Sequence, residues 1–340
     1  MNPGLLMRLQ QLSSVEKKQL KSQSLNDDIP PAALDLAGMH RLNRPVFNNY
    51  FFNNRDVFVS KHNRFAPYPL HSHHFLEINY VLSGEIHEIV NGDPVTLKKD
   101  DLLLLDVGSS HSIAAPGKDD IMMNILFRDK NISINLLNQI QSKQSELYNF
   151  LINSVLKPQQ ASGQYLLFPK ERGNDDVKLT VDRLIEEYYS HRSFADTIIQ
   201  AYLNILIAKL VRNYRIPSAP TTPAQKLAIK TLQEIHSNYQ DISLADIAKK
   251  YSYNANYLGN QFHKETGKTF SQALTSERLI HARELVSSTQ LPINDIMRAV
   301  GISNSSFFYH KYKEQYGCLP REDRASSYHQ LTSILSDELD

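Results

Sequence analysis

Two histidines and a glutamate lie close together in one segment, as His71-Ser72-His73 and Glu77, and a further histidine, His111, follows later in the chain. Because side chains alternate along a strand, residues 71, 73 and 77 would share one side of an extended chain. Neutral imidazoles with a carboxylate suit Fe, Mn, Ni or Zn. The same groups can hydrogen-bond a small molecule, or they can serve only the structure. The residues alone leave these three interpretations open.

The segment that must position these residues, Val46 to about Arg128, is predicted to be all β. Short β-branched and aromatic runs alternate there with turn signals, which is typical of a small antiparallel sandwich or barrel. Asn91-Gly92 predicts a tight hairpin between residues 85–90 and 94–97, because both residues tolerate the positive φ of a type I′ turn.

The hydrophobic pattern becomes helical from Ile132 to Arg215. Residues 196–211 carry an apolar face that must pack against the barrel or against a second copy of the chain, and we expect it to pair two chains; this face consists of Ile198, Tyr202, Ile205 and Leu206. Residues 216–223 contain three prolines and predict a semi-extended linker. Thr222 can cap the next helix, with Pro223 at its first position.

Beyond the linker, a helix-turn-helix pattern occurs twice. The first unit starts with a capping sequence at Ser243, and Asn254 can cap its second helix. The second unit starts at Ile293, about fifty residues later, and Gly317 is expected to end its last helix. A connecting helix over residues 271–286 joins the two units. Repetition at matched spacing favours a tandem DNA-binding block over ordinary helical hairpins.

This block resembles the AraC/XylS family of transcription regulators from Ala224 to Arg324. The resemblance is carried by Leu244–Ala248, Asn256–Leu258, Phe262–Gly267, Phe270, Arg278–Leu279, Ala282, Asp295–Ile296, Val300–Ile302 and Lys313–Pro320. Three positions depart from the family's pattern. Ile302 and Tyr312 stand where the family usually has Phe, and Asp323 stands where it usually has an aromatic residue.

The resemblance also implies which residues meet DNA. It places the base-facing positions of the first recognition helix at Asn256, Gly259 and Asn260, and those of the second at Ser305, Ser306, Tyr309 and His310. Lysines flanking these helices are expected to contact phosphates, and the main ones are Lys264, Lys311 and Lys313. Because asparagine pairs bidentately with adenine, the first unit is expected to favour A·T pairs.

The β segment is similar to the cupins, whose motif combines two histidines and a carboxylate with a further histidine across the barrel. Cupin-like sensing domains of AraC-type regulators bind effectors with such residues. The expected effector-binding set is therefore His71, His73, Glu77 and His111, with Tyr80 and Arg64 added for their proximity in sequence. Because a DNA-binding block is fused to this segment, sensing of an effector is favoured over catalytic turnover of a substrate. The alternative is a metal-dependent cupin enzyme with a helical accessory domain, in which His71, His73, Glu77 and His111 hold a divalent metal.

Composition limits the function classes. The 340 residues carry a formal net charge of +1, so overall charge gives no reason to expect nucleic-acid binding, and local motifs must supply it. The longest apolar stretch, residues 198–211, is shorter than a membrane span and is interrupted by polar residues. A single cysteine, Cys318, and the lack of a secretory signal pattern fit a reducing cytoplasm.

We therefore expect an α+β multidomain, cytoplasmic transcription regulator that is not an enzyme and needs no cofactor. It should bind double-stranded DNA as a homodimer and respond to a sugar or glycoside, as resemblance to the carbohydrate-responsive branch of the family implies. Contact with RNA polymerase stays open, and no membrane is expected. The predicted order is an N-terminal helical extension (1–40), a cupin-like barrel (41–130), a helical dimerisation segment (131–215), a linker (216–223), a tandem helix-turn-helix domain (224–328) and a tail (329–340).

Overall fold

The computed structural model describes residues 1–340 except 26–28, 53–54, 141–144, 157–162, 172–174, 215–221 and 326–340. The chain divides into two compact units, residues 1–221 and residues 222–340. Most of the expected linker and the whole C-terminal tail lie outside the described residues. In the described parts of the chain, no helix combines the length and hydrophobicity needed to span a bilayer.

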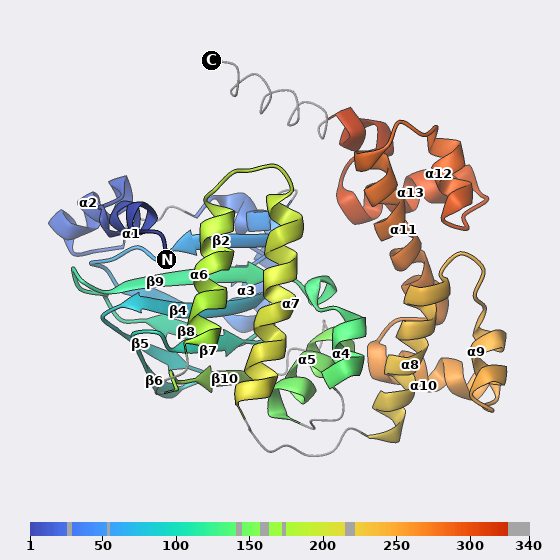
Figure 1. Ribbon diagram of the computed structural model, residues 1–340, viewed down its shortest axis with the longest axis horizontal. Helices are drawn as coiled ribbons and strands as arrows, with labels where there is room; N and C mark the ends of the chain where they lie inside the picture. The colour runs from blue at the N-terminus through green and yellow to red at the C-terminus, as the bar shows by residue number, and fades with distance from the viewer. Residues whose placement is uncertain are drawn as a thin grey trace. The chain divides into compact units, whose positions relative to one another are not determined.

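The first unit is built on two five-stranded sheets (Figure 1). Sheet 1 has the order β1 (Val46–Phe47), β3 (Tyr68–His73), β8 (His111–Ile113), β5 (Glu85–Val90) and β6 (Asp93–Lys98). Sheet 2 has the order β10 (Tyr165–Phe168), β7 (Leu102–Leu105), β4 (Leu76–Ser83), β9 (Ile121–Phe127) and β2 (Val57–Lys61). Paired strands are antiparallel except β1 and β3. The antiparallel cupin-like fold predicted from the sequence is confirmed.

Alternation along the strands builds the core between the two sheets. Ile86 and Val90 of sheet 1 pack with Leu103 and Met122 of sheet 2 in one buried cluster. The hairpin between β5 and β6 forms as predicted, and its two turn residues have φ values of 53° and 94° at Asn91 and Gly92. One element differs from the sequence-based expectation. Residues 165–168, in the segment predicted to be helical, form β10, because β7 offers them an open sheet edge.

Helices flank the sheets of the first unit. They are α1 (Pro3–Gln10), α2 (Ser14–Ser22), α3 (Leu36–Leu42), α4 (Ile134–Ile140), α5 (Glu146–Leu156), α6 (Asp176–Tyr188) and α7 (Ala195–Asn213), with short 3₁₀ turns at Pro31–Ala33, Asn49–Phe52 and Asp129–Asn131. In Figure 1, α6 and α7 lie side by side across sheet 2. The face of α7 that we expected to pair two chains is only partly exposed. Leu206 is fully buried in this unit, whereas Ile198 and Ile205 remain exposed.

The second unit is all helical, with α8 (Pro223–Asn238), α9 (Leu244–Lys250), α10 (Ala255–Thr266), α11 (Phe270–Ser288), α12 (Ile293–Ala299) and α13 (Ser305–Tyr316). The predicted caps form. The side chains of Thr222, Ser243 and Asn254 accept hydrogen bonds from the first backbone N–H groups of α8, α9 and α10. Gly317 ends α13 in the left-handed conformation that favours glycine. Both predicted helix-turn-helix units are therefore present.

One glycine is required by close packing between elements of this unit. Gly301 has a φ of 80°, and a Cβ atom there would lie 2.2 Å from the backbone oxygen of Gln240. The turn between α12 and α13 can therefore pass close to the end of α8 only with glycine at this position.

Two of the positions that depart from the family's pattern contact each other. The Tyr312 hydroxyl donates to Asp323 Oδ2 at 2.8 Å, and Arg283 Nε on α11 donates to the same oxygen at 2.8 Å. Asp323 and Tyr312 are both buried. An ion pair with a shared hydroxyl thus replaces apolar contacts beneath the second helix-turn-helix unit.

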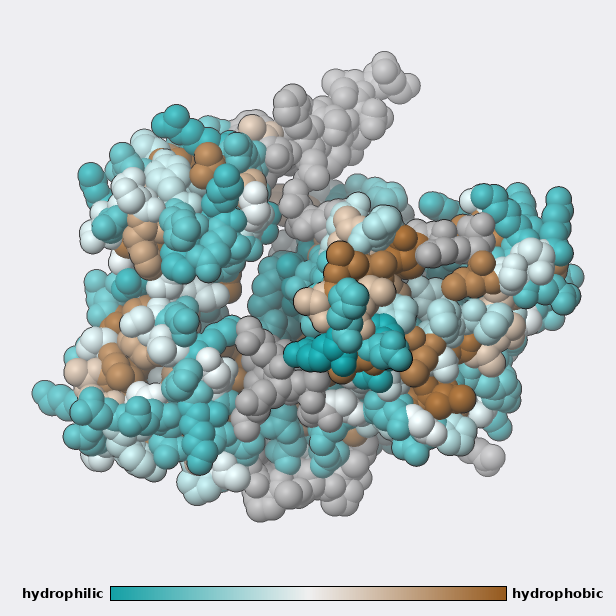
Figure 2. Space-filling model, turned by 180° about the vertical axis from the view of Figure 1, so that it is seen from behind, coloured by the Kyte–Doolittle hydropathy of each residue, from teal (hydrophilic) through white to brown (hydrophobic). Residues whose placement is uncertain are grey.

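Hydrophobic side chains also reach the surface, as the separate brown patches on the face shown in Figure 2 illustrate. The exposed ones include Leu36, Phe194 and Phe307. Scattered apolar residues are normal on a soluble surface, so exposure alone assigns them no role.

We expect Asp323→Ala to lower the free energy of unfolding of the second unit by about 2 kcal/mol, because it leaves the Arg283 guanidinium and the Tyr312 hydroxyl without their buried acceptor. Asp295→Ala is the control. Asp295 faces Arg298 in an exposed pair at 3.6 Å, so its loss should cost less than about 0.5 kcal/mol. Urea denaturation followed by far-UV circular dichroism measures both. Equal effects of the two substitutions would contradict the role given to Asp323.

Candidate effector pocket and DNA-binding surface

A cavity of about 390 Å³ opens within the first unit. Its walls are rich in aromatic rings, which come from Phe47, Tyr50, Phe51, Phe58, Tyr68 and Phe75. Polar groups occupy part of the wall, among them Lys61, His62, His71, Glu77 and Asn124. The N-terminal segment contributes Gln19, Leu25, Ile29 and Pro30. A mainly apolar pocket with a few polar groups is the usual form of a small-molecule site.

The predicted histidines and Glu77 meet beside this cavity. His73 Nε2 lies 3.6 Å and His111 Nε2 lies 3.8 Å from Glu77 Oε2, and all three side chains are buried. The His71 ring lies 4.2 Å from the His111 ring and lines the cavity. The four residues come from three strands, β3, β4 and β8, and not from one strand and a second across the barrel as expected. A break at residues 74–75 separates His73 from Glu77.

Two of the imidazoles are oriented by hydrogen bonds of their Nδ1 atoms to groups outside the cluster. His73 Nδ1 lies 2.6 Å from the backbone oxygen of Phe75, and His111 Nδ1 lies 3.1 Å from Glu88 Oε2. A proton on each Nδ1 atom makes those hydrogen bonds and leaves the Nε2 lone pairs directed toward the site. Neither Nε2 atom has a hydrogen-bond partner.

Sequence reasoning missed Glu88, which also accepts a hydrogen bond from Asn79 Nδ2 at 3.1 Å. The available signal was the alternation along β5. It turns Glu88 inward together with Ile86 and Val90, and the structure buries all three. An acidic residue at an inward position of a predicted strand needs a partner, and His111 provides it.

The cupin-like fold raises the question whether the residues fit a metal ion. Among the described residues, His73, Glu77 and His111 offer ligand atoms within 4.8 Å of one another. Two unpartnered imidazole nitrogens and a carboxylate suit Zn²⁺, Fe²⁺, Mn²⁺ or Ni²⁺. The donor set therefore fits a divalent ion, with three protein ligands and not the four of the sequence-based alternative, since His71 faces the cavity.

On the surface of the second unit, one side of α10 carries polar residues spaced four apart. Asn256, Asn260 and Lys264 are all exposed, so they lie along one stripe, whereas Leu258 and Phe262 are buried on the opposite side. On α13, the exposed positions predicted to meet DNA are Ser305, Ser306, His310 and Lys313.

Comparisons with known proteins agree with this architecture. Residues 247–326 match a helix-turn-helix domain family, and residues 61–127 match the cupin domain family. The HTH-type transcriptional activator RhaR of Escherichia coli O139:H28 is 25% identical over 256 residues, which cover 75% of this chain and 86% of that protein. RhaR of Escherichia coli K12 is 24% identical over the same shares. The chain therefore combines a helix-turn-helix domain with a cupin domain and is similar to transcriptional activators over most of its length. These similarities support DNA-binding regulation as its function class.

Solved structures that are similar to this chain include ToxT from Vibrio cholerae, which is 16% identical, with a match that covers 78% of this chain and 96% of ToxT and a TM-score of 0.34. The C-terminal domain of AraT, a response regulator from Geobacillus stearothermophilus, is 27% identical over 32% of this chain and 88% of its own, with a TM-score of 0.29.

Three residues that are predicted to contact DNA also make contacts within the protein. Gly259 is half-buried, and a Cβ atom there would lie 3.1 Å from Leu244 Cδ2, so this position packs against α9. Tyr309 is half-buried against the core of the second helix-turn-helix unit. Lys311 Nζ donates to Glu314 at 2.7 Å. Gly259 and Tyr309 thus also serve packing, and their contact with bases stays a prediction.

Two exposed aromatic residues at matching positions were missed by sequence reasoning. Tyr257 and Phe307 are each the third residue after an asparagine cap, and 49% and 41% of their surfaces are exposed. The signal was their equal distance from the caps at Asn254 and Asn304. Both side chains stand beside the predicted base-facing positions, where an aromatic ring can contact a thymine methyl group.

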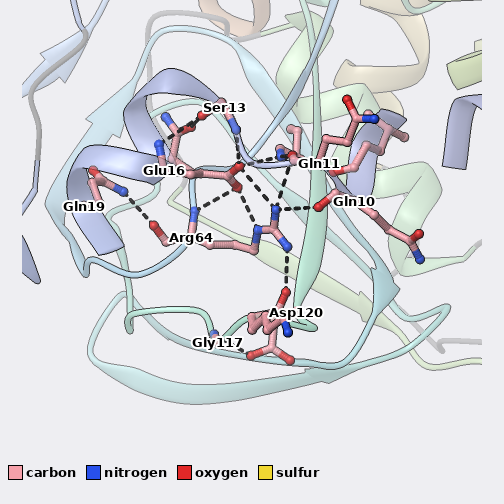
Figure 3. A network of polar contacts seen from close by, with 12 residues as sticks. Gln10, Gln11, Ser13, Glu16, Gln19, Arg64, Gly117 and Asp120 are labelled. Carbon is pink, nitrogen blue, oxygen red and sulfur yellow. Dashed lines mark hydrogen bonds and ion pairs between the residues drawn. The ribbon is translucent and has the colours of Figure 1, made fainter. Parts of the chain in front are cut away.

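Two residues predicted to bind the effector lie elsewhere. Tyr80 is on the opposite face of β4 from Glu77, and its hydroxyl donates to Asp100 Oδ1 at 3.1 Å. Arg64 is buried in a polar network with the N-terminal helices (Figure 3), in which its Nε donates to Glu16 Oε1 at 2.8 Å and one of its terminal nitrogens donates to the backbone oxygen of Gln10 at 3.0 Å. Arg64 thus holds the N-terminal segment against the barrel. Proximity in sequence was a poor guide because strands separate neighbouring residues.

Burial keeps the metal-free histidine cluster neutral. It raises the pKa of Glu77 to about 8, with the nearby Glu88 adding to the effect, and it raises the pKa of Glu88 to about 7. Burial also lowers the pKa of His111 to about 3 and holds the pKa values of His71 and His73 well below the usual range. At neutral pH the imidazoles and the Glu77 carboxyl group therefore carry no charge.

This protonation predicts a pH dependence for metal-free protein. The pKa of Glu77 rises from 4.5 to about 8 on folding, so its contribution to stability is complete below pH 4.5 and is lost as the pH rises toward 8. We expect Glu77→Gln, which mimics the protonated form, to raise the unfolding temperature of the first unit increasingly between pH 5 and pH 8. Exposed Glu85 provides the control Glu85→Gln. The measurement is thermal unfolding in EDTA at each pH. Unfolding temperatures of wild type and Glu77→Gln that change in parallel with pH would contradict a neutral Glu77 carboxyl group in the folded protein.

The stripe on α10 separates base reading from phosphate contact. Asn256→Ala and Asn260→Ala should each weaken binding to a DNA sequence selected from a random pool by about 1–3 kcal/mol and change binding to random DNA little. Lys264→Ala should weaken binding to both DNAs similarly, because a phosphate contact carries no sequence information. Fluorescence anisotropy measures each affinity. Equal losses of the asparagine variants on both DNAs would show that these residues do not read bases.

Proposed function

We propose that this regulator is controlled by a small neutral effector, a sugar or glycoside, that binds in the cavity of the first unit. The observation that carries the proposal is the neutral cluster of His71, His73, Glu77 and His111 beside an aromatic cavity. Sugar hydroxyl groups donate and accept hydrogen bonds, so they match neutral imidazoles and a protonated carboxyl group without bringing a charge into a buried site.

The other cavity walls suit the same ligand class. Asn124 Oδ1 is buried without a hydrogen-bond partner and can accept a bond from a hydroxyl group. Rings such as Phe47 and Tyr68 offer flat apolar surfaces to the C–H faces of a sugar. A charged effector would have to desolvate its charge against these walls, which disfavours acids and amines.

A second candidate adds a divalent metal to the same pocket, because the Nε2 atoms of His73 and His111 have no partner. His73, Glu77 and His111 would hold the ion, which would supply a Lewis-acidic anchor for effector oxygens. His71 would still line the cavity for the effector. Elemental analysis of the wild type beside His111→Ala distinguishes the two candidates, since only a metal-holding barrel loses about one equivalent of metal through that substitution.

We also propose that two copies pair through the exposed part of α7, around Ile198 and Ile205, in the cytoplasm. A second copy is the commonest cover for such a face. Each copy of the second unit would then present its recognition helices to one half of a paired site in double-stranded DNA. Contact with RNA polymerase would follow DNA binding and involves no residue identified so far.

The test is a screen of free pentoses, hexoses and methyl glycosides for stabilisation of the full chain in thermal unfolding. For a sugar that binds, His71→Ala and Glu77→Ala should weaken binding at least about tenfold, because each leaves sugar hydroxyl groups unpaired in a buried site. His87→Ala, on the exposed side of β5, should change nothing. All three variants should still bind selected DNA, because the substituted residues lie in the first unit and the recognition helices lie in the second. A sugar response that survives Glu77→Ala would contradict the proposed pocket.

A further inference from the structure

A second group of metal-type ligands lies in the DNA-binding unit, where α8 meets α11. His236 comes from α8, and Glu277 and His281 stand four residues apart on α11. His236 Nδ1 lies 2.6 Å from Glu277 Oε1, and His281 Nε2 lies 3.2 Å from the same oxygen. One ligand atom from each residue lies within 4.8 Å of the others, and all three residues are half-buried.

The surroundings of His281 fix which nitrogen faces the group. His281 Nδ1 lies 3.2 Å from Glu284 Oε2, so a proton on Nδ1 makes that hydrogen bond. The Tyr239 ring stacks on the imidazole at 4.1 Å with an angle of 14° between the planes. His281 Nε2 is buried and makes no hydrogen bond. A carboxylate behind a histidine, with the far nitrogen free, is the arrangement that supports metal-bound histidines.

We propose that His236, Glu277 and His281 form a Zn²⁺ site. Two imidazoles and one carboxylate are ligands that Zn²⁺ takes when a fourth position is left to water. In such a site neighbouring ligand atoms are about 3.3 Å apart, as two bonds of about 2.0–2.1 Å at the tetrahedral angle require. The contact of 3.2 Å between His281 Nε2 and Glu277 Oε1 already has this length, and the contact of 2.6 Å between His236 Nδ1 and Glu277 Oε1 would lengthen on binding. The carboxylates of Glu277 and Glu284 balance the charge of the ion.

Bound zinc would join the two helices that flank the first helix-turn-helix unit. Arg278, next to Glu277 in sequence, already ties the same junction, because its side chain donates to the backbone oxygens of Tyr239 and Gln240 at 2.7 Å each. A cation between α8 and α11 would therefore stabilise α11, which leads into the second helix-turn-helix unit. The site is independent of the effector pocket, which lies in the other compact unit.

The experiment titrates ZnCl₂ into the full chain after chelator treatment, with binding measured by calorimetry. The histidine cluster of the barrel is disabled by His111→Ala, so that one candidate metal site remains among the residues that the structure describes. We expect about one equivalent of zinc in this background. His281→Gln and Glu277→Gln should each reduce zinc affinity at least about tenfold, whereas His263→Gln, an exposed histidine of the same unit, should not.

A second measurement keeps the test decisive if His111→Ala disturbs the barrel. In the otherwise unchanged chain, zinc should raise the unfolding temperature of the second unit, and His281→Gln should abolish that rise. Zinc binding that survives Glu277→Gln combined with His281→Gln, or no binding in the His111→Ala background at micromolar zinc, would overturn the proposal. Zinc uptake lost only through His111→Ala would assign the metal to the barrel alone.

Discussion

Each recognition helix must bury one side in a small helical core while its other side stays free, and this constraint governs the DNA-binding unit. An asparagine starts both helices, and buried residues follow at the fourth and eighth positions after it. These are Leu258 and Phe262 after Asn254, and Phe308 and Tyr312 after Asn304. The cap fixes where the helix starts, and the two buried side chains fix its rotation. Only the positions between them remain for DNA.

The same register explains how the two helices differ. The second, sixth and tenth positions after the cap carry Asn256, Asn260 and Lys264 on α10. On α13 they carry Ser306, His310 and Glu314. The first helix therefore presents side chains suited to the predicted adenine and phosphate contacts, whereas the tenth position of the second carries an acid that pairs with Lys311. We expect the first helix-turn-helix unit to supply most of the sequence specificity. The aromatic side chains at the third position are common to both.

Burial of polar groups governs the barrel as the helix register governs the second unit. Glu77, Glu88 and three histidines lie in or beside an apolar core, where a charge is costly without a partner. Burial holds these groups largely neutral, which is why we propose a neutral ligand, or a cation that replaces the protons, for this site. The buried side chains of Arg64 and Glu16, in contrast, form an ion pair of opposite charges. This pair attaches the N-terminal helices to the barrel.

Local patterns predicted local structure well. Asn91-Gly92 specified its hairpin, and the caps at Thr222, Ser243 and Asn254 specified helix starts, because each depends on residues close in sequence. Contacts across the fold were harder to predict. Glu88 and Asp323 are buried carboxylates whose most distant partners, His111 and Arg283, lie 23 and 40 residues away, so only the folded chain pairs them. Tyr80 and Arg64 were misplaced for the same reason. β10 formed because an open sheet edge outweighed the pattern of its own segment.

Both recognition helices are expected to enter DNA in the same complex. Hydroxyl-radical footprinting of the full chain on a selected DNA tests it most directly. Two helices joined by a single connecting helix should protect two patches on one face of the duplex, about 10 base pairs apart, for each bound chain. The account predicts that Asn256→Ala weakens the patch under α10 and leaves the other in register. A single protected patch per chain in the unmodified protein would contradict it.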